Sequence, residues 1–250
     1  MIGPAKKGLT VIEQPPPALG RRHLLGISLS AAGVLAGSAC GNSQPKTRQP
    51  DAPAGDEAPV TPPEDLMREH GVLKRVLLIY REGIHRLQAS DQAPTQALNA
   101  GAQIIRSFIE DYHEHLEEQY VFPTLEQTGK LTDITAVLRT QHQRGRALTD
   151  RVLAATTAAA APDQPARDAL VQGMSAFIRM YEPHEAREDT VVFPEFRDVL
   201  PAKELRDLAE TFEAEEHRRF GRAGFQGVVD KVADIEKSLG IYDLSQFTAT

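Results

Sequence analysis

Hydrophobic residues recur at the spacing of an α-helix through most of the chain after residue 60. The stretch Thr61-Pro62-Pro63-Glu64 has the sequence of a capping box with proline at the first helical position, which predicts that a helix begins there. Apolar residues then follow at helical intervals: Leu66, Leu73, Val76, Leu77, Ile84 and Leu87. Because no stretch alternates with period two for long enough to predict a strand, we expect an all-α fold.

The same pattern predicts six helices, at about residues 62–88, 94–120, 131–160, 164–190, 202–219 and 227–238. Two of them are expected to end at a Phe-Pro pair, Phe122-Pro123 or Phe193-Pro194, because proline has no N–H for the helix to use. The first four are of similar length, about 25 residues or about 38 Å, which favours an antiparallel four-helix bundle. We expect this bundle over residues 62–200, with residues 201–250 as a C-terminal extension of one or two helices that packs on it.

The first 39 residues have the character of an export signal. A basic leader precedes an uncharged, mostly apolar run at residues 24–39, which is shorter than the ~20 residues of a transmembrane helix. Such a leader and run are typical of a secretory signal. Within it, Arg21-Arg22 followed by His23-Leu24-Leu25 resembles the twin-arginine signal. The prediction is therefore an exported protein, in the periplasm or on the outer face of a bacterial membrane.

Cys40 follows three small residues, 37–39, and two kinds of cleavage fit this stretch. One is ordinary signal-peptidase cleavage after a small residue. The other is a lipoprotein cut, after which a lipidated Cys40 would tether the protein to the membrane. An uncleaved single-span anchor is the third alternative. Residues 40–61 are rich in proline and poor in large apolar residues, which predicts a disordered linker.

Composition excludes several classes of function. With a single cysteine among 250 residues, the chain can form neither an internal disulfide nor a cysteine-rich zinc module or iron–sulfur cluster. Its 35 acidic against 28 basic residues give a net charge of −7, so we expect no nucleic-acid partner. The eight histidines are then the main candidates for chemistry.

An internal repeat organises those histidines. Residues 113–123 align without gaps to residues 184–194, with six of eleven positions identical, and a similar interval relates His70 to His142. The domain is therefore expected to contain two helical hairpins of one design, each with a histidine early on its first helix and a His-x-x-x-Glu motif late on its second. In antiparallel hairpins these positions lie at the same height, so six residues can meet in one layer: His70, His113, Glu117, His142, His184 and Glu188.

This set of side chains suits metal ions. Residues at i and i+4 share one helical face, so each motif presents an imidazole and a carboxylate in the same direction. Mixed imidazole and carboxylate ligands suit iron, manganese or zinc. Four imidazoles and two carboxylates exceed the needs of one ion and suit two, with the carboxylates between them. Without cations, burial of both carboxylates would be very costly.

The pattern resembles the hemerythrin-like, or HHE cation-binding, family over residues 62–200. That resemblance implies a four-helix bundle with a non-haem di-iron centre, bridged by two carboxylates and an oxo or hydroxo group. It also implies the ligands: His70 and His113 for one iron, His142 and His184 for the other, and Glu117 and Glu188 as bridges. Two iron ions are the expected cofactor, ahead of manganese or zinc.

Two departures from the oxygen-carrying members affect the expected chemistry. Arg146 stands where those members have a second histidine on the third helix, and the aspartate expected after the last histidine would be Asp189. Glu114, Glu185 and Asp189 are then candidates for additional ligands. A site with more carboxylate and less imidazole favours the oxidised metal, and so redox turnover over reversible oxygen carriage.

These features lead to one main hypothesis and two competitors. The first is an exported di-iron protein that binds or reduces dioxygen, hydrogen peroxide or nitric oxide, with a redox partner that the sequence does not identify. The second is a module that binds, stores or senses oxygen or iron without turnover, and the third a structural bundle with a zinc-filled or vestigial site. A ferritin-like centre fits poorly, because Tyr181 stands where its second Glu-x-x-His motif needs glutamate.

The remaining candidate residues receive no ligand role. Tyr181 is expected either to face the site as a hydrogen-bond partner or, as we favour, to be core. The two Phe-Pro pairs are expected to close one end of the bundle. His85, His115 and His217 are expected to lie outside the metal layer.

Overall fold

The computed structural model describes residues 60–89, 92–157 and 162–249. The predicted export signal, Cys40 and almost all of the predicted linker lie outside these residues. Every regular element of the described part of the chain is helical, and it contains no strand. This confirms the all-α fold class.

Four long helical stretches make up most of the compact unit that runs from Asp56 to Thr250. Two of them are composite, because π-helical segments, labelled η, interrupt the α-helix. The elements are α1 (Pro62–Gln88), α2 (Thr95–Ile104), η1 (Ile105–His113), α3 (Glu114–Leu116), η2 (Glu117–Val121), α4 (Phe122–Gln127), α5 (Thr132–Thr156), α6 (Gln164–Arg187), η3 (Glu188–Val192) and α7 (Phe193–Val199).

The C-terminal part adds two further helices, α8 (Ala202–Phe220) and α9 (Gly224–Leu239), with short 3₁₀ turns η4 (Gly221–Ala223) and η5 (Leu244–Phe247). The boundaries of α8 and α9 lie within three residues of those expected from the hydrophobic pattern. No helix among the described residues is both long enough and apolar enough to cross a membrane.

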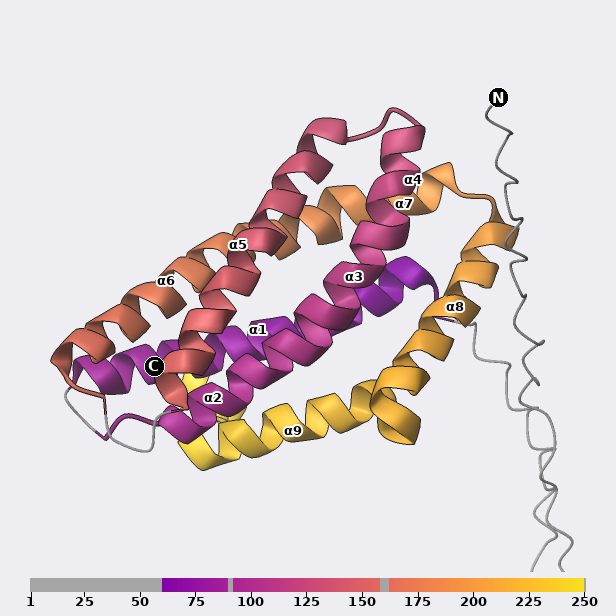
Figure 1. The fold of residues 1–250 in the computed structure, drawn as a ribbon. Coiled ribbons are helices and arrows are strands. Elements are labelled where there is room, and N and C mark those ends of the chain that lie inside the picture. The colour runs from indigo at the N-terminus through magenta and orange to yellow at the C-terminus, as the bar shows by residue number, and fades with distance from the viewer. Residues whose placement is uncertain (1–59, 90–91, 158–161, 250) are drawn as a thin grey trace, which may run out of the picture. The chain divides into compact units, whose positions relative to one another are not determined.

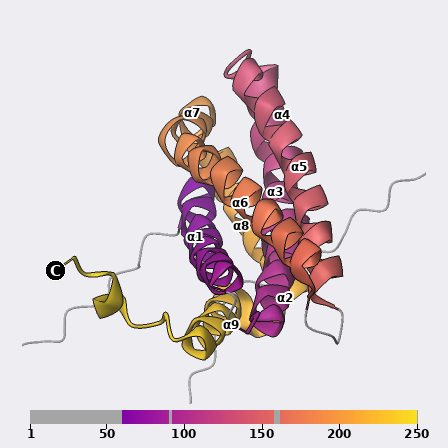
Figure 2. The ribbon, with the colours of Figure 1, turned by 90° about the vertical axis from the view of Figure 1, so that its left-hand side faces the viewer.

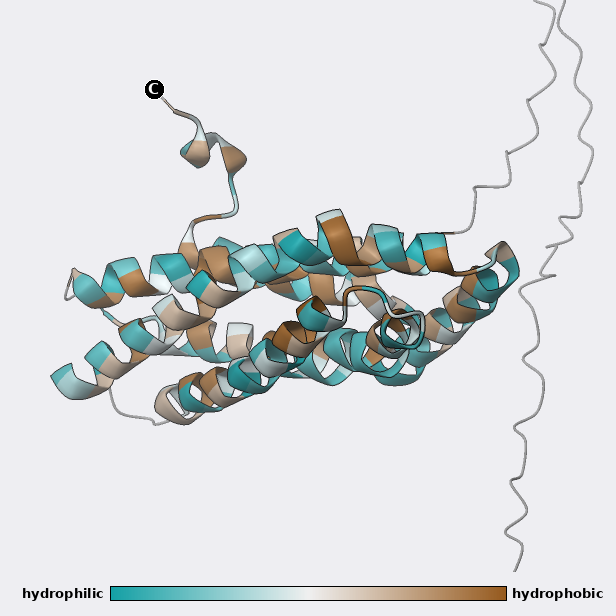
Figure 3. Ribbon diagram, turned by 90° about the horizontal axis from the view of Figure 1, so that it is seen from above, coloured by the Kyte–Doolittle hydropathy of each residue, from teal (hydrophilic) through white to brown (hydrophobic). Residues whose placement is uncertain are grey.

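The long helices enclose a common core. α1 contacts α2 and α6, and α5 contacts the same two helices, so the four lie side by side in a closed ring (Figures 1 and 2). Hydrophilic and hydrophobic residues alternate around each helix (Figure 3), as expected for helices with one buried face. α9 packs against α1 and α2, while α8 contacts α1.

The first helix begins where its capping box predicts. The backbone N–H of Thr61 donates to the Glu64 carboxylate at 2.9 Å, and α1 starts at Pro62. This cap fixes the start of α1, and with it the positions of the residues one and two turns later that face the interior, His70 among them.

The expected helix stops at the two Phe-Pro pairs were wrong. Each helix instead widens into a π-helical turn and continues beyond the proline, as α4 to Gln127 and as α7 to Val199. The N–H groups of Phe122 and Phe193 donate to carbonyls five residues earlier, those of Glu117 and Glu188. A proline ring normally clashes with the carbonyl four residues before it. A wider turn just before the proline relieves this clash, so the helix continues beyond the proline.

Close approach of α5 and α6 depends on a glycine. A Cβ added at Gly145 would lie 2.8 Å from Cζ of the fully buried Tyr181 and closer still to its hydroxyl. No such obstacle exists at Gly173, a buried glycine within α6 that has no atom within 4 Å of an added Cβ.

Gly145→Ala should therefore lower the free energy of unfolding by about 1–3 kcal/mol, because the tyrosine must move out of a packed core. The matched change Gly173→Ala should raise it by about 0.5–1 kcal/mol, because alanine loses less backbone freedom on folding. Urea denaturation of the two variants measures both. Equal effects of the two substitutions would contradict the tight α5–α6 contact at Gly145.

Candidate metal centre

Four buried histidines converge between the long helices in two pairs. His70 of α1 and His113 of η1 form one pair, with their Nε2 atoms 3.1 Å apart. His142 of α5 and His184 of α6 form the other, with ring centroids 5.1 Å apart. One carboxylate joins each pair: Glu117 lies with the first and Glu188 with the second, each trio having ligand atoms within 4.8 Å of one another.

The two carboxylates also span the pairs. Glu117 places Oε1 3.6 Å from Nε2 of His113 and Oε2 3.5 Å from Nε2 of His142. Glu188 Oε2 lies 3.1 Å from Nε2 of His184 and 3.4 Å from Nε2 of His70. Each carboxylate thus reaches one histidine of each pair, which is the arrangement needed to bridge two ions.

In the described part of the chain only the neighbouring histidines offset the charge of these carboxylates. All six side chains are at most 4% exposed, and neither oxygen of Glu117 or of Glu188 accepts a hydrogen bond of regular geometry. Nε2 of His142 also lacks a hydrogen-bond partner. Buried, unpaired carboxylates are costly unless a cation is present. The residues therefore fit a pair of bound metal ions, with nitrogen and oxygen ligands already turned inward.

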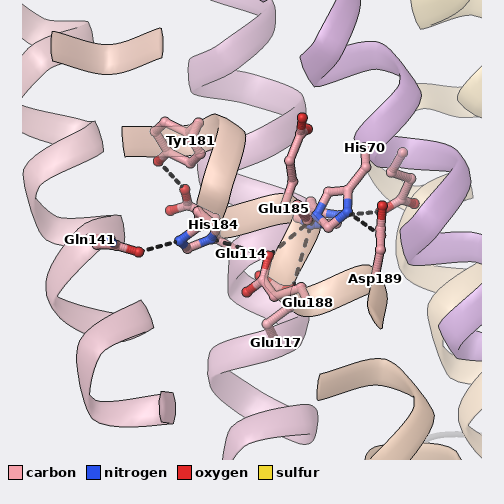
Figure 4. Close-up of polar contacts among 12 residues, drawn as sticks. His70, Glu114, Glu117, Gln141, Tyr181, His184, Glu185, Glu188 and Asp189 are labelled. Carbon is pink, nitrogen blue, oxygen red and sulfur yellow. Dashed lines mark hydrogen bonds and ion pairs between the residues drawn. The ribbon is translucent and has the colours of Figure 1, made fainter. Parts of the chain in front are cut away.

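The outer nitrogen of each histidine is held from outside the site, as Figure 4 shows for His70 with Asp189 and for His184 with Gln141. Each Nδ1 lies within hydrogen-bond distance of a side-chain oxygen, which leaves Nε2 free to face the centre. The pairs are His70 with Asp189 at 2.7 Å, His113 with Glu69 at 2.7 Å, His142 with Glu118 at 2.9 Å, and His184 with Gln141 at 2.8 Å.

The four outer partners occupy positions directly next to site residues in the sequence, in both halves of the repeat. Glu69 and Gln141 directly precede His70 and His142, while Glu118 and Asp189 directly follow Glu117 and Glu188. Each partner therefore sits beside a site residue on its own helix and holds a histidine of another helix. Sequence reasoning missed Glu69, Glu118 and Gln141, although their adjacency to the six site residues was a usable signal.

In the protein without metal ions, protons and ion pairs balance the buried charge. Burial, and then the charge of Glu188, raise the pKa of Glu117 well above its usual value. Although burial acts the other way, His184 and His70 hold the pKa of Glu188 well below its usual range. Burial likewise opposes the charged form of His70, but the hydrogen bonds that His70 donates to Asp189 and Glu188 raise its pKa to about 9. Burial and the nearby charge of His70 lower the pKa of His113. Bound cations would replace these protons.

The additional ligand candidates lie outside the inner set. Asp189 faces the outer nitrogen of His70 rather than Nε2, so it is placed to orient that ring. Glu114 accepts a hydrogen bond from Tyr181 at 2.6 Å and pairs with Arg146 at 3.0 Å. Glu185 is buried near Lys74, whose Nζ lies 3.9 Å from its Oε1. None of the three belongs to either His–His–Glu trio.

Neighbouring residues take part in the surroundings of the site. Tyr181 combines the two alternatives expected of it: it is buried, and its hydroxyl donates to Glu114, which places it in the polar network around the site. The two Phe-Pro pairs do more than shape the helices. The ring of Phe193 stacks on His70 at 5.4 Å, and that of Phe122 stacks on His142 at 5.5 Å. These phenylalanines therefore form walls of the site.

The other residues lie where the sequence placed them. His85, His115 and His217 are exposed, away from the four buried rings. Arg146, at the position of the missing histidine, turns its guanidinium to Glu114 and Glu118, with Nη2 2.9 Å from Glu118 Oε1. It thus reinforces an outer partner of His142.

Comparison with known proteins agrees with this geometry. The hemerythrin HHE cation binding domain matches residues 61–196, and again residues 133–234. The chain belongs to the hemerythrin HHE cation-binding family. Three similar relatives are uncharacterized proteins of Mycobacterium bovis and of two strains of Mycobacterium tuberculosis. Each is 76% identical over 249 residues, which cover 98% of both chains. No solved structure matches the chain.

The buried carboxylates predict different effects in the two metal states. In metal-free protein, Glu117→Gln with Glu188→Gln should lower the free energy of unfolding by about 1–3 kcal/mol, because Glu188 loses its interactions with His184 and His70. In the presence of metal, the variant should lack the stabilisation that wild type gains, about 2.7 kcal/mol at a metal concentration of 100 times Kd. Thermal melts with and without metal measure this. As a control, Glu204→Gln with Glu210→Gln removes two exposed carboxylates of α8. If the Glu117/Glu188 variant kept the full metal-dependent shift, the site would be misplaced.

The outer hydrogen bonds predict a graded loss of affinity. Gln141→Ala releases Nδ1 of His184 and should weaken metal binding by about 10–100-fold. Gln143→Ala on the exposed face of the same helix should leave it unchanged. Competition with a coloured chelator gives both affinities, and equal values for the two variants would argue against an orienting role for Gln141.

Proposed function

We propose that this chain is an exported non-haem di-iron protein that reduces a small oxidant: dioxygen, hydrogen peroxide or nitric oxide. The observation that carries the proposal is the pair of buried carboxylates, Glu117 and Glu188, each set between two histidine pairs and otherwise unbonded. The closed ring of α1, α2, α5 and α6 supports the antiparallel four-helix bundle that the family implies.

Burial limits the substrate to a molecule of a few atoms. The six inner side chains are at most 4% exposed, and aromatic rings cover His70 and His142. When bound, two irons would supply electrons and open coordination positions to such a molecule.

Charge around the histidines favours turnover over reversible binding. Three of the four outer partners are carboxylates, those of Glu69, Glu118 and Asp189. A carboxylate on Nδ1 makes the imidazole a stronger electron donor through Nε2. Ligands of this kind stabilise an oxidised metal, so a reduced centre would readily pass its electrons to an oxidant.

The side chains next to the site are suited to handling the protons that such a reduction consumes. Glu114 lies between the Tyr181 hydroxyl and Arg146, close to His142. Glu110 lies one turn earlier on the same helix, where burial raises its pKa to about 7, and it accepts a hydrogen bond from Thr149. We propose that Glu110 holds a proton on the α5 side of the site.

The main alternative is a protein that binds or stores oxygen or iron without turnover. The buried site serves that role as well, so kinetics must separate the two. Iron-loaded protein with excess hydrogen peroxide and an electron donor should consume many equivalents per chain, whereas a binding or storage protein would stop after about one equivalent per site.

The direct test uses oxidant consumption by the iron-loaded protein. We expect steady consumption of at least one of hydrogen peroxide, dioxygen or nitric oxide when an electron donor is supplied to re-reduce the centre. The rate should fall to background in Glu117→Gln with Glu188→Gln, and stay at the wild-type value in the Glu204/Glu210 control. Stoichiometric consumption that then stops would favour the storage alternative. A protein that contains zinc and consumes no oxidant would exclude both the oxidant-reducing function and the storage alternative.

Export and the membrane tether are proposed from residues 1–40, outside the described part of the chain. A fusion of these residues to a reporter that must fold before export should appear outside the cytoplasm, and Arg21→Lys with Arg22→Lys should hold it inside. Cys40→Ser should abolish incorporation of labelled fatty acid without blocking export. Unchanged export of the double-lysine variant would contradict the twin-arginine assignment.

A further inference from the structure

A short segment after α9 carries apolar side chains away from the bundle (Figures 2 and 3). Ile241 still packs on the core, but Leu244 is 82% exposed and Phe247 is 55% exposed. No other large apolar side chain among the described residues is as exposed as Leu244. Water strongly favours the burial of such side chains. Two of them on one exposed turn therefore indicate a surface that another surface covers.

Local hydrogen bonds hold this segment in shape. Gly240 has a left-handed φ of 73°, and the hydrogen bonds of a Schellman motif end α9 there. The Asp243 carboxylate then accepts from the N–H of Ser245 at 2.9 Å, where the 3₁₀ turn η5 begins. Residues three apart on a 3₁₀ helix lie on the same side. Leu244 and Phe247 therefore point in one direction, and we call this pair of side chains the apolar knob.

A groove of about 410 Å³ lies along the contact of α5 with α6. Large apolar side chains and small residues line it, among them Leu148, Val152, Ala155, Leu170, Gly173 and Ala176. The groove is open at Gly173, where an added Cβ would meet no atom within 4 Å. Its lining extends over two helical turns, or about 10 Å. The two side chains of the knob lie about 6 Å apart along their 3₁₀ turn, so the groove is long enough for both.

The knob and the groove lie on different sides of one chain. α9, from which the knob extends, packs against α1 and α2, whereas the groove lies between α5 and α6. In the ring of four helices these two faces are opposite each other. Figure 2 shows the segment after α9 leaving on the side of α1, away from α5. This placement favours the groove of another copy over the groove of the same chain.

Charge next to the two surfaces favours the same pairing. Arg151 lines the groove; it is exposed and has no carboxylate partner among the residues that the structure describes. Asp243, directly before Leu244 in the knob, is also exposed. With the knob in the groove of another copy, these opposite charges can come together, which orients the two chains.

We propose that the apolar knob of one copy binds in the α5–α6 groove of a second copy of this chain, with Asp243 beside Arg151. Reciprocal exchange of two knobs covers both and closes the assembly at two copies. This interaction goes beyond the proposed function and does not depend on it, because it involves none of the six inner side chains.

The first experiment measures the mass of the full chain in solution by size-exclusion chromatography with light scattering. The chain carries Cys40→Ser, so that no lipid is attached. We expect the mass of two chains. Leu244→Ser with Phe247→Ser should raise the dissociation constant of the pair at least tenfold, whereas Leu78→Ser, at an exposed apolar residue of α1, should leave it unchanged. A thermal melt checks that each variant is folded. A single-chain mass for the parent protein, or equal dissociation constants for parent and knob variant, would overturn the proposal.

The second experiment identifies which groove the knob occupies. One Cys40→Ser chain carries Ser245→Cys in η5, and another carries Gln172→Cys, at an exposed residue of the groove. Mixed and mildly oxidised, the two should form a disulfide-linked pair. Glu204→Cys in place of Gln172→Cys should not.

A chain with both Ser245→Cys and Gln172→Cys tests closure on itself. We expect it to cross-link to a second chain. Cross-linking only within one chain would show the knob in its own groove and would overturn the proposal, as would equal cross-linking at Glu204→Cys and Gln172→Cys in the mixtures.

Discussion

The structure depends on two carboxylates held in a dry layer among four imidazoles. Glu117 and Glu188 are fully buried, and none of their oxygens accepts a hydrogen bond of regular geometry. A fold can keep such groups only if cations neutralise them or if protons take the cations' place. The features around them follow from this requirement. Helices on all sides exclude water, rings of Phe122 and Phe193 cover two histidines, and outer carboxylates hold the imidazoles with Nε2 inward.

The internal repeat explains how the chain builds this site: one short sequence pattern is used twice. Each half supplies a histidine from one helix and a His-x-x-x-Glu from the next, and residues adjacent to these hold the histidines of other helices. The π-helical turns recur at the same place, between each glutamate and its Phe-Pro pair. The two halves also differ at two equivalent positions. Gln141 serves as an outer partner in the second half where Glu69 does so in the first, and Tyr181 occupies the position in the second half that Glu110 occupies in the first. These differences make the surroundings of the two metal positions unequal.

Much of this arrangement could be read from the sequence, for identifiable reasons. Helical periodicity and the Thr61 cap placed the start of α1, and the spacing of the repeat brought the six inner residues into one layer. The turn at Phe122-Pro123 was misread because a π-helical turn leaves no clear mark on the hydrophobic pattern. The contact of Tyr181 with Glu114 depends on Gly145, which lets α5 and α6 approach closely. Contacts of this kind require the register between helices, which a single sequence does not contain.

The most direct test of the account is the metal content of the protein purified without oxygen from iron-replete cells. The account predicts about two irons per chain, as a two-metal site requires. Zinc in place of iron, or less than one metal ion per folded chain, would contradict it.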